Sequence, residues 1–170
     1  MDWRDKAACL TADPELFFPV GNTGPAVDQI VDFDEVFDRV LLLVAEVASS
    51  HNTTVRPVKT GKFGPLPSAY ATPLALALTE LVTNAVEHGL AGRADGKVEI
   101  SAKRKNEHLT IRVRDNGVGL PEGKVGSGLG TQIVRTLIQG ELSGTIDWHT
   151  LEGEGTEVTI EVPLFWLNRS

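Results

Sequence analysis

Residues 76–89 read Leu-Ala-Leu-Thr-Glu-Leu-Val-Thr-Asn-Ala-Val-Glu-His-Gly, and their pattern predicts a helix with a polar stripe. Its leucines and valines recur at the three- and four-residue spacing of an amphipathic helix. Glu80, Asn84 and His88 lie four positions apart, so they share one polar stripe on an otherwise apolar helix. Such a stripe is often only the solvent-facing side of a helix. A carboxylate and an amide oxygen together also suit Mg²⁺, so the helix carries a candidate metal site.

A second motif lies at the end of a predicted strand, where residues 113–119 read Val-Arg-Asp-Asn-Gly-Val-Gly. An aspartate before glycines is often an ordinary turn, because both residue types favour turn geometry. The alternative is a binding role, in which Asp115 accepts a hydrogen bond from an exocyclic amine. Gly117 and Gly119 would then let the backbone approach a flat base. The motif alone leaves both interpretations open.

A third motif, Gly-Ser-Gly-Leu-Gly-Thr at residues 126–131, leads directly into a predicted helix. Closely spaced glycines before a helix form a phosphate cradle, because the first backbone N–H groups are free and the helix dipole favours an anion. A Rossmann fingerprint is excluded because Thr131 stands where its third glycine is required, and no P-loop lysine motif is present. The predicted phosphate contacts are Gly126, Ser127, Gly128, Leu129, Gly130 and Thr131.

The remaining pattern predicts the order helix, strand, helix, hairpin, helix, hairpin. The first helix begins at Phe33 with Asp32 as its N-cap, the second begins at Thr72-Pro73 and ends at Gly89, and residues 61–67 form a loop. This order predicts a two-layer α/β (α+β) sandwich, in which three helices cover one face of a mixed, mostly antiparallel sheet. The expected ranges of the other elements are residues 53–58, 97–103, 108–114, 128–139, 144–149 and 157–162.

Composition limits the function classes. The 170 residues suit one globular domain with a short extension, and the net charge of −7 argues against direct nucleic-acid binding. The longest apolar run is too short to span a bilayer, and the N-terminus has no secretory signal, so neither a membrane nor secretion is expected. A cytoplasmic protein is therefore the default expectation.

Together the three motifs resemble the boxes of the GHKL superfamily of gyrase, histidine kinase and MutL ATPases, across residues 31–164. Their order implies a Bergerat fold and an ATP site. The sequence of residues 76–89 resembles that of the sensor histidine kinases of the HWE-related class. The spacing of six residues between Gly119 and Gly126 resembles that class as well. The short spacing implies a short ATP lid, residues 120–125.

The resemblance implies a role for each matching position. Asn84 would bind Mg²⁺, and Glu80 would be the catalytic residue, holding water in the metal's shell. Asp115 would accept from the adenine amine with support from Thr156, directly or through water, and Gly117 and Gly119 would lie against the base. His88 belongs to the first box, residues 126–131 would wrap the phosphates, and Lys124 on the lid is the expected cationic contact.

Two departures from the family pattern change the expected activity. Glu87 stands where many histidine kinases have a basic residue, so it cannot neutralise phosphate. No phosphoacceptor helix is recognisable, and none of the histidines (His51, His88, His108 and His149) lies in an acceptor segment. The resemblance therefore implies a catalytic domain that binds ATP or ADP but cannot autophosphorylate as this chain stands. Its partners would be a separate histidine phosphoacceptor domain and a downstream response regulator of the ANTAR type.

Two other functions stay open from the residues. A stand-alone serine kinase of the anti-sigma type shares the same boxes, and in it Glu80 would act as a general base. A non-catalytic interaction module would keep the fold without using the nucleotide site.

Residues 1–30 resemble a different family, the WhiB-like iron–sulfur regulators. Residues 3–9 read Trp-Arg-Asp-Lys-Ala-Ala-Cys, and residues 13–19 read Asp-Pro-Glu-Leu-Phe-Phe-Pro. These regulators hold their cluster with four cysteines, whereas Cys9 is the only cysteine in this chain, so no iron–sulfur cluster is expected. We expect residues 1–30 to be a fused, non-native extension and residues 31–170 to be the catalytic domain.

Overall fold

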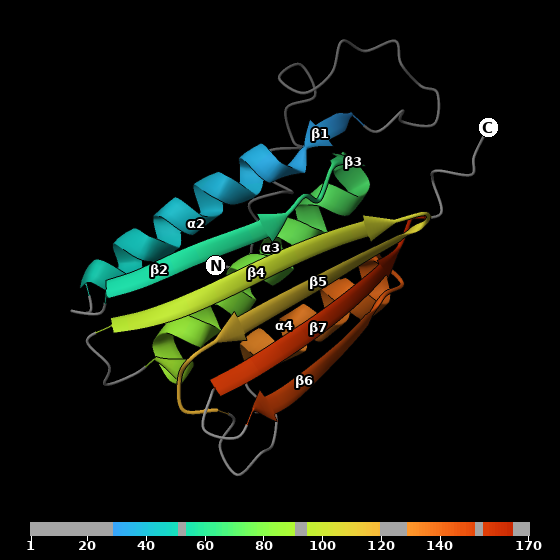
Figure 1. Ribbon diagram of the computed structural model, residues 1–170. Helices are drawn as coiled ribbons and strands as arrows, with labels where there is room; N and C mark the ends of the chain where they lie inside the picture. The colour runs from blue at the N-terminus through green and yellow to red at the C-terminus, as the bar shows by residue number, and fades with distance from the viewer. Residues whose placement is uncertain (1–28, 51–53, 91–94, 120–128, 152–154, 165–170) are drawn as a thin grey trace, which may run out of the picture.

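The computed structural model describes residues 29–50, 54–90, 95–119, 129–151 and 155–164. Within these ranges, the main sheet has five strands in the order β2-β4-β5-β7-β6 (Figure 1). Only β2 and β4 run parallel to each other, and the other neighbours are antiparallel. The strands are β2 (Thr54–Gly61), β4 (Asp95–Lys105), β5 (His108–Asp115), β6 (Thr145–Leu151) and β7 (Gly155–Pro163).

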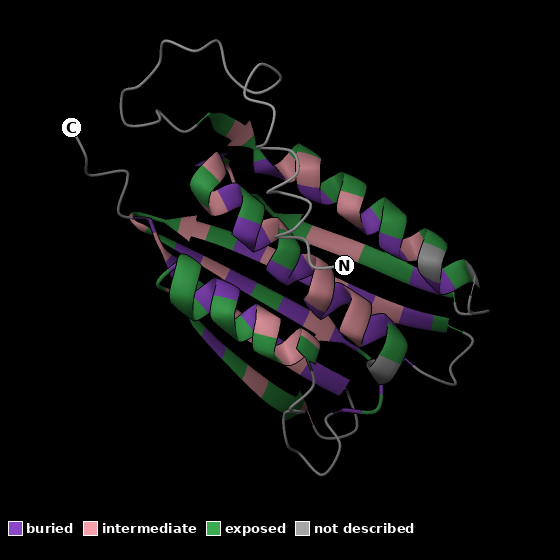
Figure 2. Cartoon of the chain, turned by 180° about the vertical axis from the view of Figure 1, so that it is seen from behind, coloured by how far each residue is buried: buried purple, intermediate pink, exposed green. Residues whose placement is uncertain are grey.

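Helices cover one face of this sheet and leave the other face open, as the two opposite views show (Figures 1 and 2). The helical segments are α2 (Phe33–Ser50), α3 (Ser68–Asn84) with the π-helical turn η2 (Ala85–Gly89), and α4 (Leu129–Arg135) with the π-helical turn η4 (Thr136–Glu141). The predicted two-layer sandwich with a mixed, mostly antiparallel sheet is confirmed. No described helix is long and apolar enough to cross a membrane.

The core lies between the two layers because each central strand alternates buried and accessible residues. Along β4 and β5 every second side chain is buried under the helices, and the intervening polar side chains face the open side. The aromatic rings of Phe33, Phe37 and Phe63 meet under the start of α2, with the Phe33 and Phe63 centroids 4.8 Å apart. The largest fully buried side chains also include Leu66, Leu74, Leu78, Leu90, Ile100, Leu109, Ile111, Ile138 and Ile160.

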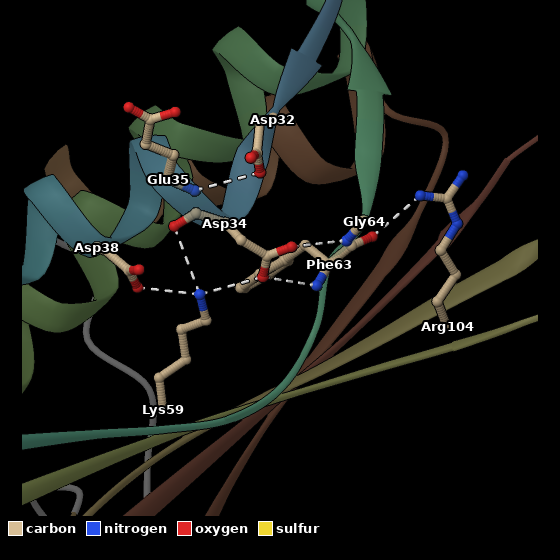
Figure 3. Close-up of polar contacts among 8 residues, drawn as sticks. All are labelled: Asp32, Asp34, Glu35, Asp38, Lys59, Phe63, Gly64 and Arg104. Atoms are coloured by element: carbon tan, nitrogen blue, oxygen red, sulfur yellow. Dashed lines mark hydrogen bonds and ion pairs between the residues drawn. The ribbon is translucent and has the colours of Figure 1, made fainter.

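Asp34 fixes the start of α2 to the segment after β2 (Figure 3). Its carboxylate accepts hydrogen bonds from the backbone N–H groups of Phe63 and Gly64, both at 3.0 Å, and pairs with Lys59 Nζ at 3.1 Å. Burial opposes the charged form of Asp34, but these hydrogen bonds and the ammonium of Lys59 outweigh it and leave its pKa lowered. From β4, Arg104 donates to the carbonyl oxygens of Phe63 and Pro65. Residues 63–65 are thus bonded to α2 on one side and to β4 on the other.

The predicted loop at residues 61–67 is therefore partly wrong. β2 continues to Gly61, and β3 (Pro65–Pro67) pairs with β1 (Ile30–Asp32) in a small antiparallel sheet. The Asp32 cap is confirmed, since its carboxylate accepts from the N–H of Glu35 at 3.4 Å.

The predicted start of the second helix is also wrong, because α3 begins at Ser68 and contains Pro73. Pro67 ends β3 in an extended conformation, so the chain turns into the helix directly after it. The predicted end at Gly89 is confirmed, but the last turn is wider than an α-helix: the N–H of Leu90 donates to Ala85 O at 2.9 Å. Such single π turns are often found at functional sites.

Candidate functional site

The described parts of the predicted motifs lie at one end of the molecule (Figure 1). Figure 1 shows the C-terminal end of α3, the end of β5 and the start of β7 at this end. Gly130, the second residue of α4, joins the first and third motifs. A Cβ atom at this position would lie 3.0 Å from Glu80 Oε2 and 3.6 Å from both side-chain polar atoms of Asn84. The glycine therefore brings the start of α4 against the carboxylate and amide of α3.

Asp115, the last residue of β5, is one of two buried polar side chains in the described part of the chain, and it is 6% exposed. Its Oδ1 accepts the backbone N–H of Gly117 at 2.8 Å. Burial raises the pKa of this carboxyl, and hydrogen bonds from the backbone N–H groups of Gly117 and Thr156 only partly oppose that effect. The backbone of Thr156 is thus one source of support for Asp115.

Asn116 was not predicted as a site residue, yet it fixes the end of β5. Its backbone N–H donates to Lys97 O at 3.2 Å, and its side-chain Oδ1 accepts the N–H of Lys97 at 2.8 Å. The side chain therefore takes the place of a backbone carbonyl in the ladder between β4 and β5. This double contact sets where the strand ends and where Asp115 is placed.

Gly155 was also not among the predicted site residues, although it holds the turn after Asp115 against β7. Its φ is +99°, and a Cβ atom there would overlap the carbonyl oxygen of Asp115 and lie 2.7 Å from Gly117 N. Gly119 has a φ of +81°, and a Cβ atom there would lie 2.9 Å from Thr150 Cγ2. Both positions require glycine, and both pack residues 115–119 onto the last hairpin.

Of the remaining predicted site residues, some have a described exposure and the others lie outside the described residues. Leu129 is strongly exposed, Thr131 is half-buried, and Glu87 is exposed on η2. His88 lies in η2, but its side chain is outside the described residues. Lys124, Gly126, Ser127, Gly128 and the predicted lid at residues 120–125 also lie outside them.

Residues 69–165 match the family described as histidine kinase-, DNA gyrase B- and HSP90-like ATPases, and the chain belongs to this family.

Within the family, the named relatives are sensor kinases. The chain is 41% identical over 143 residues to the sensor histidine kinase PdtaS of Mycobacterium tuberculosis, across 82% of this chain and 28% of PdtaS. The chain thus spans little more than a quarter of the length of that relative. Its fold is similar to the histidine kinase domain of the Erythrobacter litoralis EL346 blue-light-activated histidine kinase. There the TM-score is 0.71 and the identity 28%, over 85% of this chain and 67% of that one.

A second similarity concerns a different family. The chain is 64% identical over 39 residues to the transcriptional regulator WhiB1 of Mycobacterium tuberculosis, across 23% of this chain and 46% of WhiB1. Similarity to a kinase and to WhiB1 in one polypeptide supports the fusion expected from the sequence.

Proposed function

We propose that this domain binds ATP with Mg²⁺ and donates the γ-phosphate to a histidine on a phosphoacceptor domain. One observation carries the proposal: Gly130 lies against Glu80 and Asn84, so the start of α4 meets the polar stripe of α3 in a chain of this ATPase family. In phosphoryl transfer a protein mostly positions groups and stabilises charge, and it need not supply a nucleophile.

Asp115 would recognise the adenine base. An ionised carboxylate only accepts hydrogen bonds, so it selects an amine such as the exocyclic N6 group. Its carboxylate is buried and accepts from the backbone of Gly117 and Thr156, and an ionised carboxylate has acceptor sites left for a further donor. Gly117 and Gly119, both buried beside it, would leave room for the flat ring.

Glu80 and Asn84 would hold the metal and its water, with Asn84 as a direct ligand and Glu80 as the catalytic residue. Mg²⁺ is usually bound through one or two protein oxygens together with substrate phosphates and water, and these two half-buried side chains fit that set. When bound, Mg²⁺ would neutralise charge on the phosphates. Residues 126–131 and Lys124 would contact the phosphates, with Lys124 supplying the positive charge that Glu87 cannot.

The chain spans only part of its kinase relatives, so we infer that it acts together with separate partners. They are ATP or ADP, a histidine-bearing dimerisation domain, and a response regulator of the ANTAR type, all in the cytoplasm. Residues 1–30 would be a fused WhiB-like extension without an iron–sulfur cluster, and residues 31–170 the catalytic domain. Absence of visible absorbance after anaerobic iron and sulfide reconstitution would support this, and a cluster spectrum would contradict it.

Nucleotide binding is tested first, by calorimetric titration of Mg-ATP into the whole chain. We expect Asn84→Ala to weaken Mg-ATP binding at least about ten-fold, since a charge-assisted contact contributes about 1.5–3 kcal/mol. Thr83→Ala is the matched control: Thr83 precedes Asn84 on α3 but lines the groove toward α2, so its variant should bind normally. Equal affinities for the two variants would contradict the metal role of Asn84.

Phosphoryl transfer is tested by adding a separately purified dimerisation domain of a related kinase and γ-labelled ATP. We expect label on that domain that is lost in acid and kept in base, as for phosphohistidine. Acid-stable label on a serine of an anti-sigma-antagonist protein would instead establish the serine kinase. A domain that binds no nucleotide would be an interaction module.

A further inference from the structure

The open face of the sheet is hollowed at its β4–β5 hairpin end, away from the nucleotide site. The hollow has a volume of about 560 Å³ and is lined by alternate residues of β4 and β5, by Asn106 in the turn between them, and by Glu161 of β7. These residues face outward because their neighbours in the strands are buried under the helices. Its cationic side chains are Lys103, Lys105 and Arg112, with His108 beside them.

The cations of this hollow differ from those at the other end of the same face. There, Arg56 pairs with Asp95 at 3.7 Å, and Lys97 pairs with Glu99. Among the described residues, none of the three cations of the hollow has a hydrogen bond or ion pair. Glu161 is the one acid in the lining. Lys103, Lys105 and Arg112 therefore form a positive cluster without described partners, although the net charge of the chain is −7.

We propose that this hollow, here called the hairpin patch (Lys103, Lys105 and Arg112), binds an acidic segment of a partner protein in an extended conformation. The spacing of the cations supports an extended ligand. Lys103 and Lys105 are two positions apart on one strand, so they lie about 6.6 Å apart, the same repeat as alternate side chains of an extended peptide. Arg112 is the diagonal neighbour of Lys103 across the ladder, about 7–8 Å away.

Charge and chemistry favour a protein segment over a nucleic acid. A protein that makes about 6–10 phosphate contacts to a nucleic acid needs more cations than the three of this patch. Single-stranded nucleic acids also need aromatic rings on which the bases stack, and the lining has only the imidazole of His108. A few carboxylates match the patch in number, and the negative charge elsewhere on the chain would repel a longer polyanion.

The test is fluorescence anisotropy of a labelled peptide of about ten alternating glutamate and serine residues, with glutamine replacing glutamate in a control peptide. We expect the acidic peptide alone to bind, more weakly as salt rises from roughly 50 to 300 mM. The double variant Lys103→Gln/Arg112→Gln should weaken binding about ten-fold, that is about three-fold for each exposed cation. Arg56→Gln, which removes one charge from the paired end of the same face, should bind within about two-fold of the unchanged chain.

Each other outcome overturns the proposal. One is that the acidic peptide does not bind at millimolar concentration and low salt. Another is that the Arg56→Gln control loses as much affinity for the peptide as the double variant does. A third is that a thymidine oligomer of the same length binds more tightly than the peptide. A dimer that dissociates in the double variant would make a second copy the occupant, which also refutes it. Mg-ATP titration of the same variants verifies folding and separates this result from the proposed kinase function, because the substituted residues lie outside the nucleotide site.

Discussion

Replacing Gly155 with alanine tests how tightly the last hairpin holds the Asp115 turn. The added Cβ would overlap Asp115 O and lie 2.7 Å from Gly117 N and 2.8 Å from Asp115 Oδ1, so it meets two backbone atoms that cannot rotate away. Alanine would also be held at a φ of +99°. Such a dihedral costs a non-glycine residue about 1–3 kcal/mol, and overpacking costs about 1–3 kcal/mol more.

We therefore expect Gly155→Ala to lower the free energy of unfolding by about 2–6 kcal/mol, a large part of the about 5–15 kcal/mol typical of a domain. Urea denaturation measures this loss, and Mg-ATP titration of the folded fraction should show weaker binding because Asp115 must move. Gly140→Ala is the matched control: apart from its chain neighbours and its own helical backbone, nothing lies within 4 Å of the added Cβ, so it should be neutral or stabilising by up to about 1 kcal/mol. A Gly155→Ala loss below about 1 kcal/mol with normal ATP affinity would refute the close-approach argument.

Three further substitutions, at Gly130, Asp115 and Asp34, test other contacts of the structure. Gly130→Ala should change the free energy of unfolding by less than about 0.5 kcal/mol, because the flexible Glu80 side chain can move away from the added Cβ. The variant should still weaken Mg-ATP binding. Normal affinity in calorimetry would contradict the placement of the phosphates beside Gly130. Asp115→Asn should abolish ATP binding without loss of stability at pH 7. The raised pKa of Asp115 makes the unchanged protein lose stability as pH rises above 3.8 toward the folded pKa, and the variant should lack this slope in urea melts. Asp34→Asn should lower the free energy of unfolding at pH 7 by about 1.5–3 kcal/mol, since charged hydrogen bonds are lost. Because the pKa of Asp34 is lowered, its contribution to stability is present above pH 3.8 and is lost as pH falls through the folded pKa. Urea melts of the two proteins should therefore converge in acid. A difference in the free energy of unfolding that stays constant with pH would be inconsistent with a charge effect.

The parts of the fold that sequence predicts are those set by local periodicity. The helices around Phe37 and Leu78, and both hairpins, follow from apolar spacing alone. Pro57 did not prevent the prediction of β2, and the structure shows why: β2 is an edge strand, where a missing N–H can face away from the ladder. The parts that were missed are short or depend on distant residues. β1 and β3 have three residues each, and Pro65 and Pro67 obscure any strand pattern.

The same distinction applies to the candidate site. Glu80, Asn84 and Asp115 stand out because their residue types break an apolar pattern or precede glycines. Gly155 and Asn116 do not, since their importance depends on contacts with Asp115 and Lys97, which lie far away in the chain. Pro73 misled the prediction of the helix start because proline is favoured at the first helical position, whereas α3 begins at Ser68 and contains it.

The parallel pairing of β2 with β4 has a consequence for synthesis in the cell. Thr54 of β2 pairs with Asp95 of β4, and all of α3 lies between them, whereas each hairpin joins strands that are adjacent in the chain. β2 therefore leaves the ribosome before β4, its neighbour among the described strands, exists. At about 5–20 residues per second, the nascent chain must wait about 2–8 seconds with α2 and β2 made but unpaired. During this interval the apolar side of α2 is a site at which a chaperone would be expected to bind.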